Sequence, residues 1–157
     1  MRILIAEDEE RARRGLRSVL TSLSEDYEVV AEASNGKQAL ELLQILKPDV
    51  VFTDLKMPFL DGMGLIKAGI AAGVCTKYVI VSAYEEFEVA RQAISLGVKE
   101  YLVKPVTYDE LKDTMERLDE AQKGKPQLID KTLKERYPDV HPLVRKSLGF
   151  IEKGYSS

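Results

Sequence analysis

The 157-residue sequence has little of what several functional classes require. Cys75 is its single cysteine, so an intrachain disulfide and a cysteine zinc site are excluded. It contains no apolar run long enough to span a bilayer, which needs roughly eighteen residues or more. The N-terminus enters an apolar run without a basic lead or a cleavage-like site, so a secretory signal is not expected. These absences together predict a cytoplasmic protein.

Catalytic and nucleotide-binding motifs are also missing. The sequence contains neither G-x-x-x-x-G-K-[ST] nor G-x-G-x-x-G, so the usual phosphate-binding loops for nucleotides are absent. His141 is the sole histidine, and it stands in a proline-rich stretch where we expect an exposed linker. A Cys/His or Ser/His nucleophile pair is therefore not available to the first 120 or so residues.

The size and charge of the chain indicate one ordinary domain with a tail. Hydrophobic residues make up 45% and charged residues 31%, a globular balance. The net charge of −3 is uneven, because residues 1–122 carry −7 and residues 123–157 carry +4. An acidic body is not expected to coat nucleic acid, whereas the basic tail predicts a unit with a different partner.

Apolar, β-branched runs alternate with segments of helical period. Strands are predicted at residues 3–5, 28–33, 49–53, 78–81 and 101–103, and apolar stripes at helical spacing lie between and after them. The strands are apolar on both faces, as covered parallel strands must be. Five such units predict a doubly wound α/β fold, flavodoxin-like, with strand order 2-1-3-4-5 and helices on both faces.

Polar residues follow four of these strands. Glu7 and Asp8 come after the first, Asp54 after the third, Ser82 ends the fourth and Lys104 follows the fifth. In the predicted order these strands are neighbours, so the side chains meet at one edge of the sheet. Three adjacent carboxylates repel one another by roughly several kcal/mol per pair. A divalent cation such as Mg²⁺ relieves that repulsion, and Mg²⁺ beside a lysine suits phosphoryl transfer.

Each of these residues alone has a simpler interpretation. A single aspartate at a strand end is more often a helix N-cap, and an isolated lysine is usually solvated. The pairs Asn35-Gly36 and Asp61-Gly62 are predicted to be turns only. The functional interpretation depends on convergence at one edge, and thus on the predicted strand order.

Residues 1–120 resemble the receiver domain of two-component response regulators, which has a CheY-like fold. The resemblance rests on Glu7-Asp8, on Thr53-Asp54-Leu-Lys-Met-Pro58, on Val81-Ser82-Ala83 and on Val103-Lys104-Pro105, each at the end of a predicted strand. It implies a phospho-accepting switch rather than an enzyme. A sensor histidine kinase is the implied donor.

The resemblance assigns Asp54 as the phospho-acceptor. It implies that Asp8, Asp54 and the backbone carbonyl of Lys56 hold Mg²⁺ directly, with Glu7 acting through a bound water. Glu7 departs from the more common aspartate by one methylene. Lys56 and Tyr84 occupy positions that tune the lifetime of the phosphoryl group in the family.

The remaining implied roles concern the switch. Lys104 would pair with a phosphoryl oxygen, Ser82 would turn its hydroxyl onto that group, and Tyr101 would move inward. The Lys104–Pro105 bond is cis in this family. Phosphorylation is then expected to change the face made by the fourth helix, fifth strand and fifth helix, which often dimerises in this family.

We predict a receiver domain at 1–121, a linker at 122–141 and a helix at 142–157. Residues 141–155 resemble the start of an AraC-type DNA-binding domain, so a transcriptional output truncated near its beginning is expected, with DNA contacted only through that domain. The alternative is a stand-alone receiver that acts by protein contact. A phosphatase of the haloacid-dehalogenase type is disfavoured, because Lys56 stands where that chemistry needs a carboxylic acid.

Overall fold

Five strands alternate with five helices in the computed structural model, which describes residues 1–123. The elements are β1 (Arg2–Ala6), α1 (Glu10–Leu23), β2 (Glu28–Ala33), α2 (Gly36–Leu46), β3 (Val50–Thr53), α3 (Gly62–Ala71), β4 (Lys77–Ser82), α4 (Phe87–Ser95), β5 (Glu100–Val103) and α5 (Tyr108–Lys123). The predicted helix at 142–157, and the predicted linker at 122–141 beyond its first two residues, lie outside the described residues. None of the helices within residues 1–123 is long and apolar enough to cross a membrane.

The chain divides into two compact units, residues 1–113 and residues 114–157. The first unit holds the whole sheet, helices α1 to α4 and the first part of α5. Every site residue predicted from the sequence belongs to this first unit.

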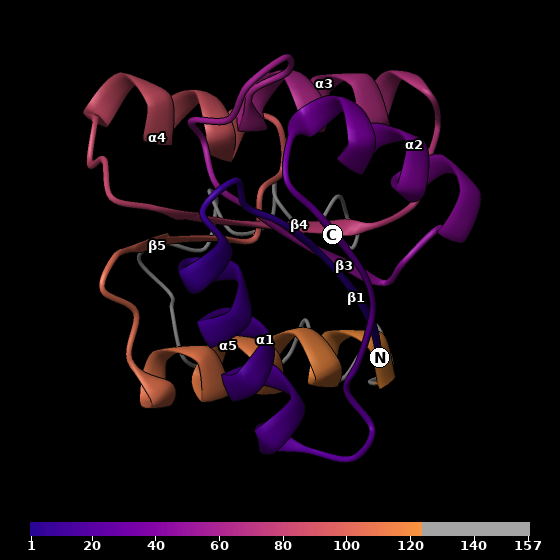
Figure 1. Cartoon of the computed structure of the whole chain (residues 1–157), viewed down its shortest axis with the longest axis vertical. Coiled ribbons are helices and arrows are strands. Elements are labelled where there is room, and N and C mark those ends of the chain that lie inside the picture. The colour runs from indigo at the N-terminus through magenta and orange to yellow at the C-terminus, as the bar shows by residue number, and fades with distance from the viewer. Residues whose placement is uncertain (124–157) are drawn as a thin grey trace, which may run out of the picture. The chain divides into compact units, whose positions relative to one another are not determined.

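The five strands form one parallel sheet in the order β2-β1-β3-β4-β5, which confirms the predicted fold (Figure 1). Every neighbouring pair is parallel, and β1 and β3 pair in unbroken register from Ile3 opposite Val50 to Ala6 opposite Thr53. The carboxyl ends of β1, β3, β4 and β5 consequently lie next to one another. This is the edge at which the predicted site residues were expected.

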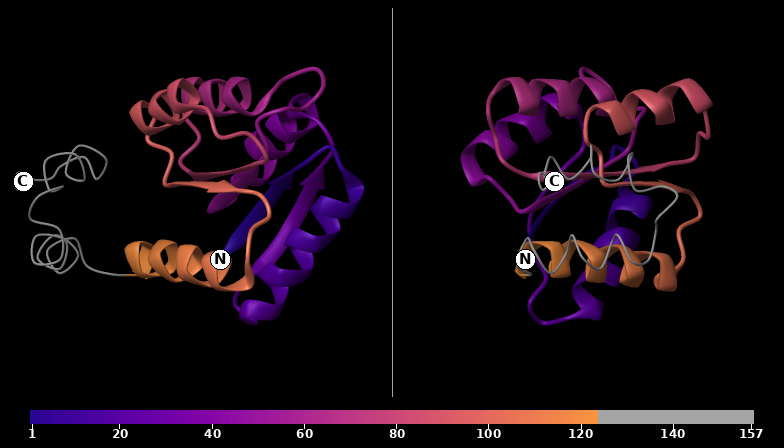
Figure 2. Two further views of the ribbon diagram at one scale, coloured as in Figure 1. Left: turned by 90° about the vertical axis from the view of Figure 1, so that its left-hand side faces the viewer. Right: turned by 180° about the vertical axis from the view of Figure 1, so that it is seen from behind.

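Helices cover both faces of the sheet. Helices α2, α3 and α4 lie on one face, and α1 lies on the other (Figures 1 and 2). All four residues of β3 are buried, as are five of the six in β4. Strands enclosed in this way lack polar alternation, which explains their continuous apolar sequence.

Two expected turns are instead helix N-termini. The Asn35 side chain accepts a hydrogen bond from Gln38 N at 2.7 Å, and Asp61 accepts one from Gly64 N at 2.7 Å, so each caps the helix that follows it. The prediction that these pairs are turns only was wrong. Because Asn and Asp favour both turns and N-caps, residue type alone does not separate the two.

Close backbone packing fixes the loop that joins β3 to α3. A Cβ atom at Gly62 would lie 2.2 Å from the Asp54 carbonyl oxygen, and one at Gly36 would lie 1.8 Å from the Leu60 carbonyl oxygen. Both glycines therefore allow approaches that a side chain would block. The backbone that follows Asp54 is thereby held against α2 and α3.

Candidate functional site

The carboxyl edge of the sheet brings together three acidic side chains. Glu7 and Asp8 follow β1, and Asp54 follows β3. Each offers an oxygen within 4.8 Å of the others. Glu7 and Asp54 are buried, whereas Asp8 is exposed. The sequence prediction that these three residues converge is met in the geometry.

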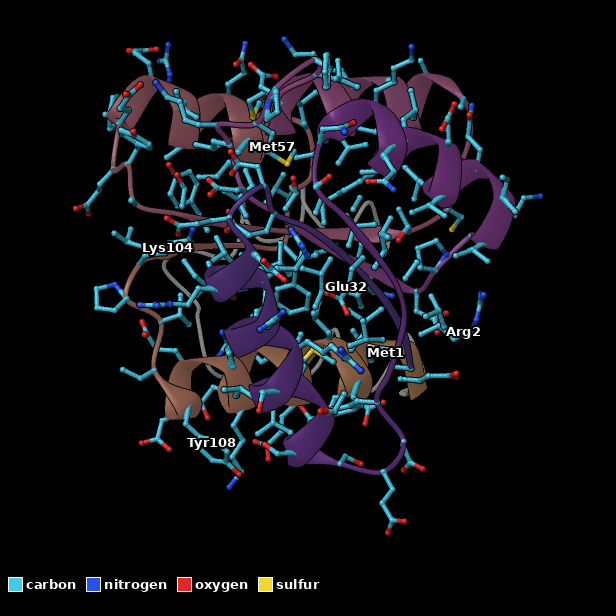
Figure 3. All side chains as sticks on the ribbon, viewed as in Figure 1. Met1, Arg2, Glu32, Met57, Lys104 and Tyr108 are labelled. Atoms are coloured by element: carbon cyan, nitrogen blue, oxygen red, sulfur yellow. The ribbon has the colours of Figure 1, made fainter. Side chains whose placement is uncertain are left out.

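Lys104, which is labelled in Figure 3, follows the end of β5 and contacts this cluster. Its Nζ donates to Glu7 Oε1 at 2.7 Å and to Asp54 Oδ2 at 3.0 Å. The side chain of Lys104 is 23% exposed, against 5% for Glu7 and 10% for Asp54. One ammonium group thus neutralises part of a largely buried negative charge.

Burial raises the pKa of Glu7 above its ordinary value, although the hydrogen bond from Lys104 works in the opposite direction. For Lys104 itself, burial alone would lower the pKa, but the hydrogen bonds to Glu7 and Asp54 outweigh burial and raise the pKa. The cluster therefore favours a charged lysine and penalises a charged Glu7. An additional cation at this edge would relieve that penalty.

The Asp54 carboxylate is oriented by its neighbours. Its Oδ1 accepts from Leu55 N at 2.6 Å, and its Oδ2 accepts from Lys104. Its own backbone N–H donates to the Ala6 carbonyl of β1 at 3.0 Å. Because both oxygens have fixed partners, the carboxylate is held in one orientation at the edge.

Ser82 and Tyr101 are joined through the loop after β4. Ser82 is fully buried, and its Oγ accepts from Tyr84 N at 3.2 Å. The Tyr101 hydroxyl donates to the Tyr84 carbonyl at 2.5 Å. The described residues show no hydrogen bond between Ser82 and Asp54. The serine and the tyrosine thus share one loop residue as a common partner.

Lys56 and Tyr84 also contact each other. The ammonium of Lys56 lies 4.6 Å from the centroid of the Tyr84 ring, a distance typical of a cation–π contact. The loop after β3 is thereby linked to the loop after β4. The Lys104–Pro105 peptide bond is cis, as the resemblance implied.

Sequence reasoning missed one side chain beside the cluster. Arg13, on the first turns of α1, donates from Nη1 to the Glu7 carbonyl at 2.7 Å and pairs with Glu32 of β2. Its sequence position gave no specific signal, because a basic residue six positions after an acidic one is ordinary on an exposed helix. Only the packing of α1 against the sheet places it there.

The molecule is thus a doubly wound parallel α/β domain with an acidic cluster and a lysine at the carboxyl edge of its sheet. The family described as the response regulator receiver domain matches residues 3–116. The chain belongs to this family.

Relatives come from several bacteria. The chain is 33% identical over 117 residues to the uncharacterized transcriptional regulatory protein YesN of Bacillus subtilis, a match that covers 74% of this chain and 32% of YesN. It is 36% identical over 104 residues to the chemotaxis protein CheY of Thermotoga maritima, covering 66% of this chain and 85% of that protein. The chain therefore spans about a third of YesN and most of CheY.

A solved structure supports the same assignment. The REC domain of AraT, a response regulator from Geobacillus stearothermophilus, is 37% identical and superposes with a TM-score of 0.66. That match covers 78% of this chain and 98% of the AraT domain. The receiver fold is thus shared across the part of the chain that carries the site.

Proposed function

We propose that this receiver domain accepts a phosphoryl group on Asp54 from a phosphohistidine of a sensor histidine kinase, in a Mg²⁺-dependent reaction. A carboxylate oxygen of Asp54 attacks phosphorus, and the bond from phosphorus to the kinase nitrogen breaks. The electron pair stays on the imidazole, which takes a proton from water. The observation that carries this proposal is the Asp54 carboxylate held between Lys104 and two further acidic residues.

The donor atoms at the edge suit Mg²⁺. The three residues offer carboxylate oxygens within 4.8 Å of one another, and oxygen is the ligand that Mg²⁺ prefers. Asp8, Asp54 and the carbonyl of Lys56 would hold the ion, with Glu7 acting through water. When bound, Mg²⁺ offsets negative charge on the transferring phosphoryl oxygens.

The chain's own residues then respond to the new charge. Acyl phosphate formation places about one to two negative charges at Asp54. In our proposal Lys104 turns from Glu7 to a phosphoryl oxygen, and the Ser82 hydroxyl releases Tyr84 to donate to another. Loss of the Ser82 contact frees Tyr84, whose carbonyl holds the Tyr101 hydroxyl. Tyr101 can then move inward.

Output follows from this change. We propose that phosphorylation promotes homodimerisation through a surface that includes α4, where Phe87 and Ile94 are 75% and 50% exposed. Control of transcription through an AraC-type DNA-binding domain is proposed from the tail resemblance and from relatives named as transcriptional regulators. A receiver that acts by protein contact alone, in the cytoplasm, is the alternative.

Intact mass spectrometry after incubation with Mg²⁺ and a small acyl phosphate tests the acceptor role. We expect one added phosphoryl group, which Asp54→Asn and chelation of the metal both abolish. Asp26→Asn, which removes an exposed carboxyl far along the chain from the site, should still accept the group. An Asp54→Asn variant that is phosphorylated as fully as the wild type would overturn the proposal.

A further inference from the structure

Arg13 fixes the backbone from which both acidic residues of the β1–α1 loop project. Its Nη1 donates to the Glu7 carbonyl at 2.7 Å. On the other side of the same residue, Glu7 N donates to the Ala33 carbonyl of β2 at 2.9 Å. The backbone of Glu7 is therefore held at both its N–H and its carbonyl.

The carbonyl contact also determines where Asp8 begins. A peptide unit is planar, so fixing the Glu7 carbonyl fixes the N–H and the Cα of Asp8 as well. Asp8 is exposed, and its carboxylate accepts no hydrogen bond from the described residues. Its position relative to Asp54 therefore depends on the backbone rather than on side-chain partners.

Glu32 holds Arg13 in this orientation. Its Oε1 lies 3.4 Å from Arg13 Nε, and its Oε2 lies 3.4 Å from Arg17 Nη1. The side chains of Arg13 and Glu32 are 18% and 26% exposed, whereas that of Arg17 is 58% exposed. Figure 3 labels Glu32 on its strand. Arg17 shares the carboxylate but makes no hydrogen bond or ion pair with Glu7.

We propose that Arg13, oriented by Glu32, is a positioning residue that holds the Glu7–Asp8 peptide where both acidic side chains can face a divalent cation. This inference rests on the proposed function, because it concerns the same cation. It assigns a role in site geometry to a basic residue whose charge opposes cation binding.

Because the positive charge of Arg13 by itself disfavours cation binding, an experiment can distinguish a positioning role from a purely electrostatic effect. Removing a positive charge near a cation site should tighten cation binding if charge alone matters. Removing a positioning residue should weaken it, as loss of groups that orient metal ligands does by roughly 10- to 100-fold. The two explanations therefore predict changes of opposite sign for Arg13→Ala.

Isothermal titration with Mg²⁺ alone, at pH 7 and constant ionic strength, measures the affinity of the full chain. We expect Arg13→Ala to raise the dissociation constant about 10- to 100-fold. Arg17→Ala is the matched control, since it removes the same charge from the same helix and the same partner carboxylate. It should bind Mg²⁺ as tightly as the wild type or slightly more tightly. Arg13→Lys, which keeps the charge and one donor, should recover part of the loss.

Each outcome of these titrations either supports or contradicts the positioning role of Arg13. Arg13→Ala affinity equal to or tighter than that of Arg17→Ala overturns the inference and leaves the proposed function standing. A wild-type chain without saturable Mg²⁺ binding overturns the proposed function, and this inference with it. If circular dichroism shows that Arg13→Ala does not fold, Arg13→Lys is the deciding variant, because it keeps the charge of Arg13 and alters only its contacts with the Glu7 carbonyl and Glu32. It should weaken Mg²⁺ binding by at least about threefold, and unchanged affinity would contradict the inference.

Discussion

Replacing Lys104 by methionine removes the ammonium group and keeps most of the side-chain length. Glu7 and Asp54 then lose their shared cation and face each other without compensation. We expect the variant to be less stable than the wild type in cation-free buffer at pH 7. We also expect Mg²⁺ to stabilise the variant more than it stabilises the wild type, because the ion no longer competes with an ammonium.

The size of the effect follows from the geometry. Two carboxylate oxygens within 4.8 Å repel by about 1 kcal/mol in bulk water and by about 3.5 kcal/mol at an effective dielectric constant near 20. Because Lys104 is 23% exposed, water replaces part of its contribution. We therefore expect a loss of about 1–3 kcal/mol in the free energy of unfolding. For a chain of this length that corresponds to a fall of about 2–12 °C in Tm.

Thermal unfolding by circular dichroism, with and without Mg²⁺, measures both effects. Lys67→Met is the control, since it removes the same charge from an exposed position on α3. It should leave Tm and the Mg²⁺ response nearly unchanged. A Lys104→Met variant that is as stable as the wild type, and that gains no more from Mg²⁺, would refute the idea that this lysine neutralises the acidic cluster.

Three further predictions use the same structure. Because the folded-state pKa of Glu7 is raised, the protonated form of Glu7 stabilises the fold relative to the charged form. This stabilisation is fully present below the ordinary pKa of 4.5 and is lost as pH rises through the folded-state pKa. Glu7→Gln should therefore become more stable than the wild type above pH 4.5 in urea titrations without cation, and it should bind Mg²⁺ more weakly. A difference in the free energy of unfolding between the two proteins that does not change with pH would contradict this. Gly69→Ala should lower the free energy of unfolding by about 1–3 kcal/mol, because its Cβ would lie 2.1 Å from the Tyr78 hydroxyl. A double-mutant cycle should show that this loss is smaller in a Tyr78→Phe background. Asp61→Ala should lose about 1 kcal/mol in urea unfolding because α3 loses its N-cap, and no loss would remove that role.

The strand order could be predicted from the sequence because few arrangements of the strands are compatible with the sequence pattern. Strands that are apolar on both faces must be covered by helices, and five alternating units with right-handed crossovers leave little choice of strand order. Once the order is known, Glu7, Asp54 and Lys104 must end at one edge. The convergence of residues separated by up to 97 positions follows from strand order alone.

Contacts that depend on the conformation of long side chains could not be predicted from the sequence. The Lys56 ammonium over the Tyr84 ring joins two loops whose paths the sequence does not determine. Arg13 is one of several arginines on α1. Arg14 pairs with Glu10, whereas Arg13 and Arg17 both pair with Glu32 of β2, and only the hydrogen bond to the Glu7 carbonyl separates Arg13 from Arg17. Asp61 was assigned to a turn because the same short carboxylate suits both turns and caps.

The buried hydroxyl of Tyr78 shows how the core restricts these helices independently of the site. Burial raises the pKa of Tyr78 to about 12, and its hydroxyl has no hydrogen-bond partner among the described residues. Gly69 of α3 is the residue whose missing side chain makes room for that hydroxyl. Helix α3 begins at Gly62, and a Cβ atom there would lie 2.2 Å from the Asp54 carbonyl oxygen. The same helix therefore packs closely on β4 at one glycine and on the backbone of Asp54 at another, and neither approach leaves room for a side chain.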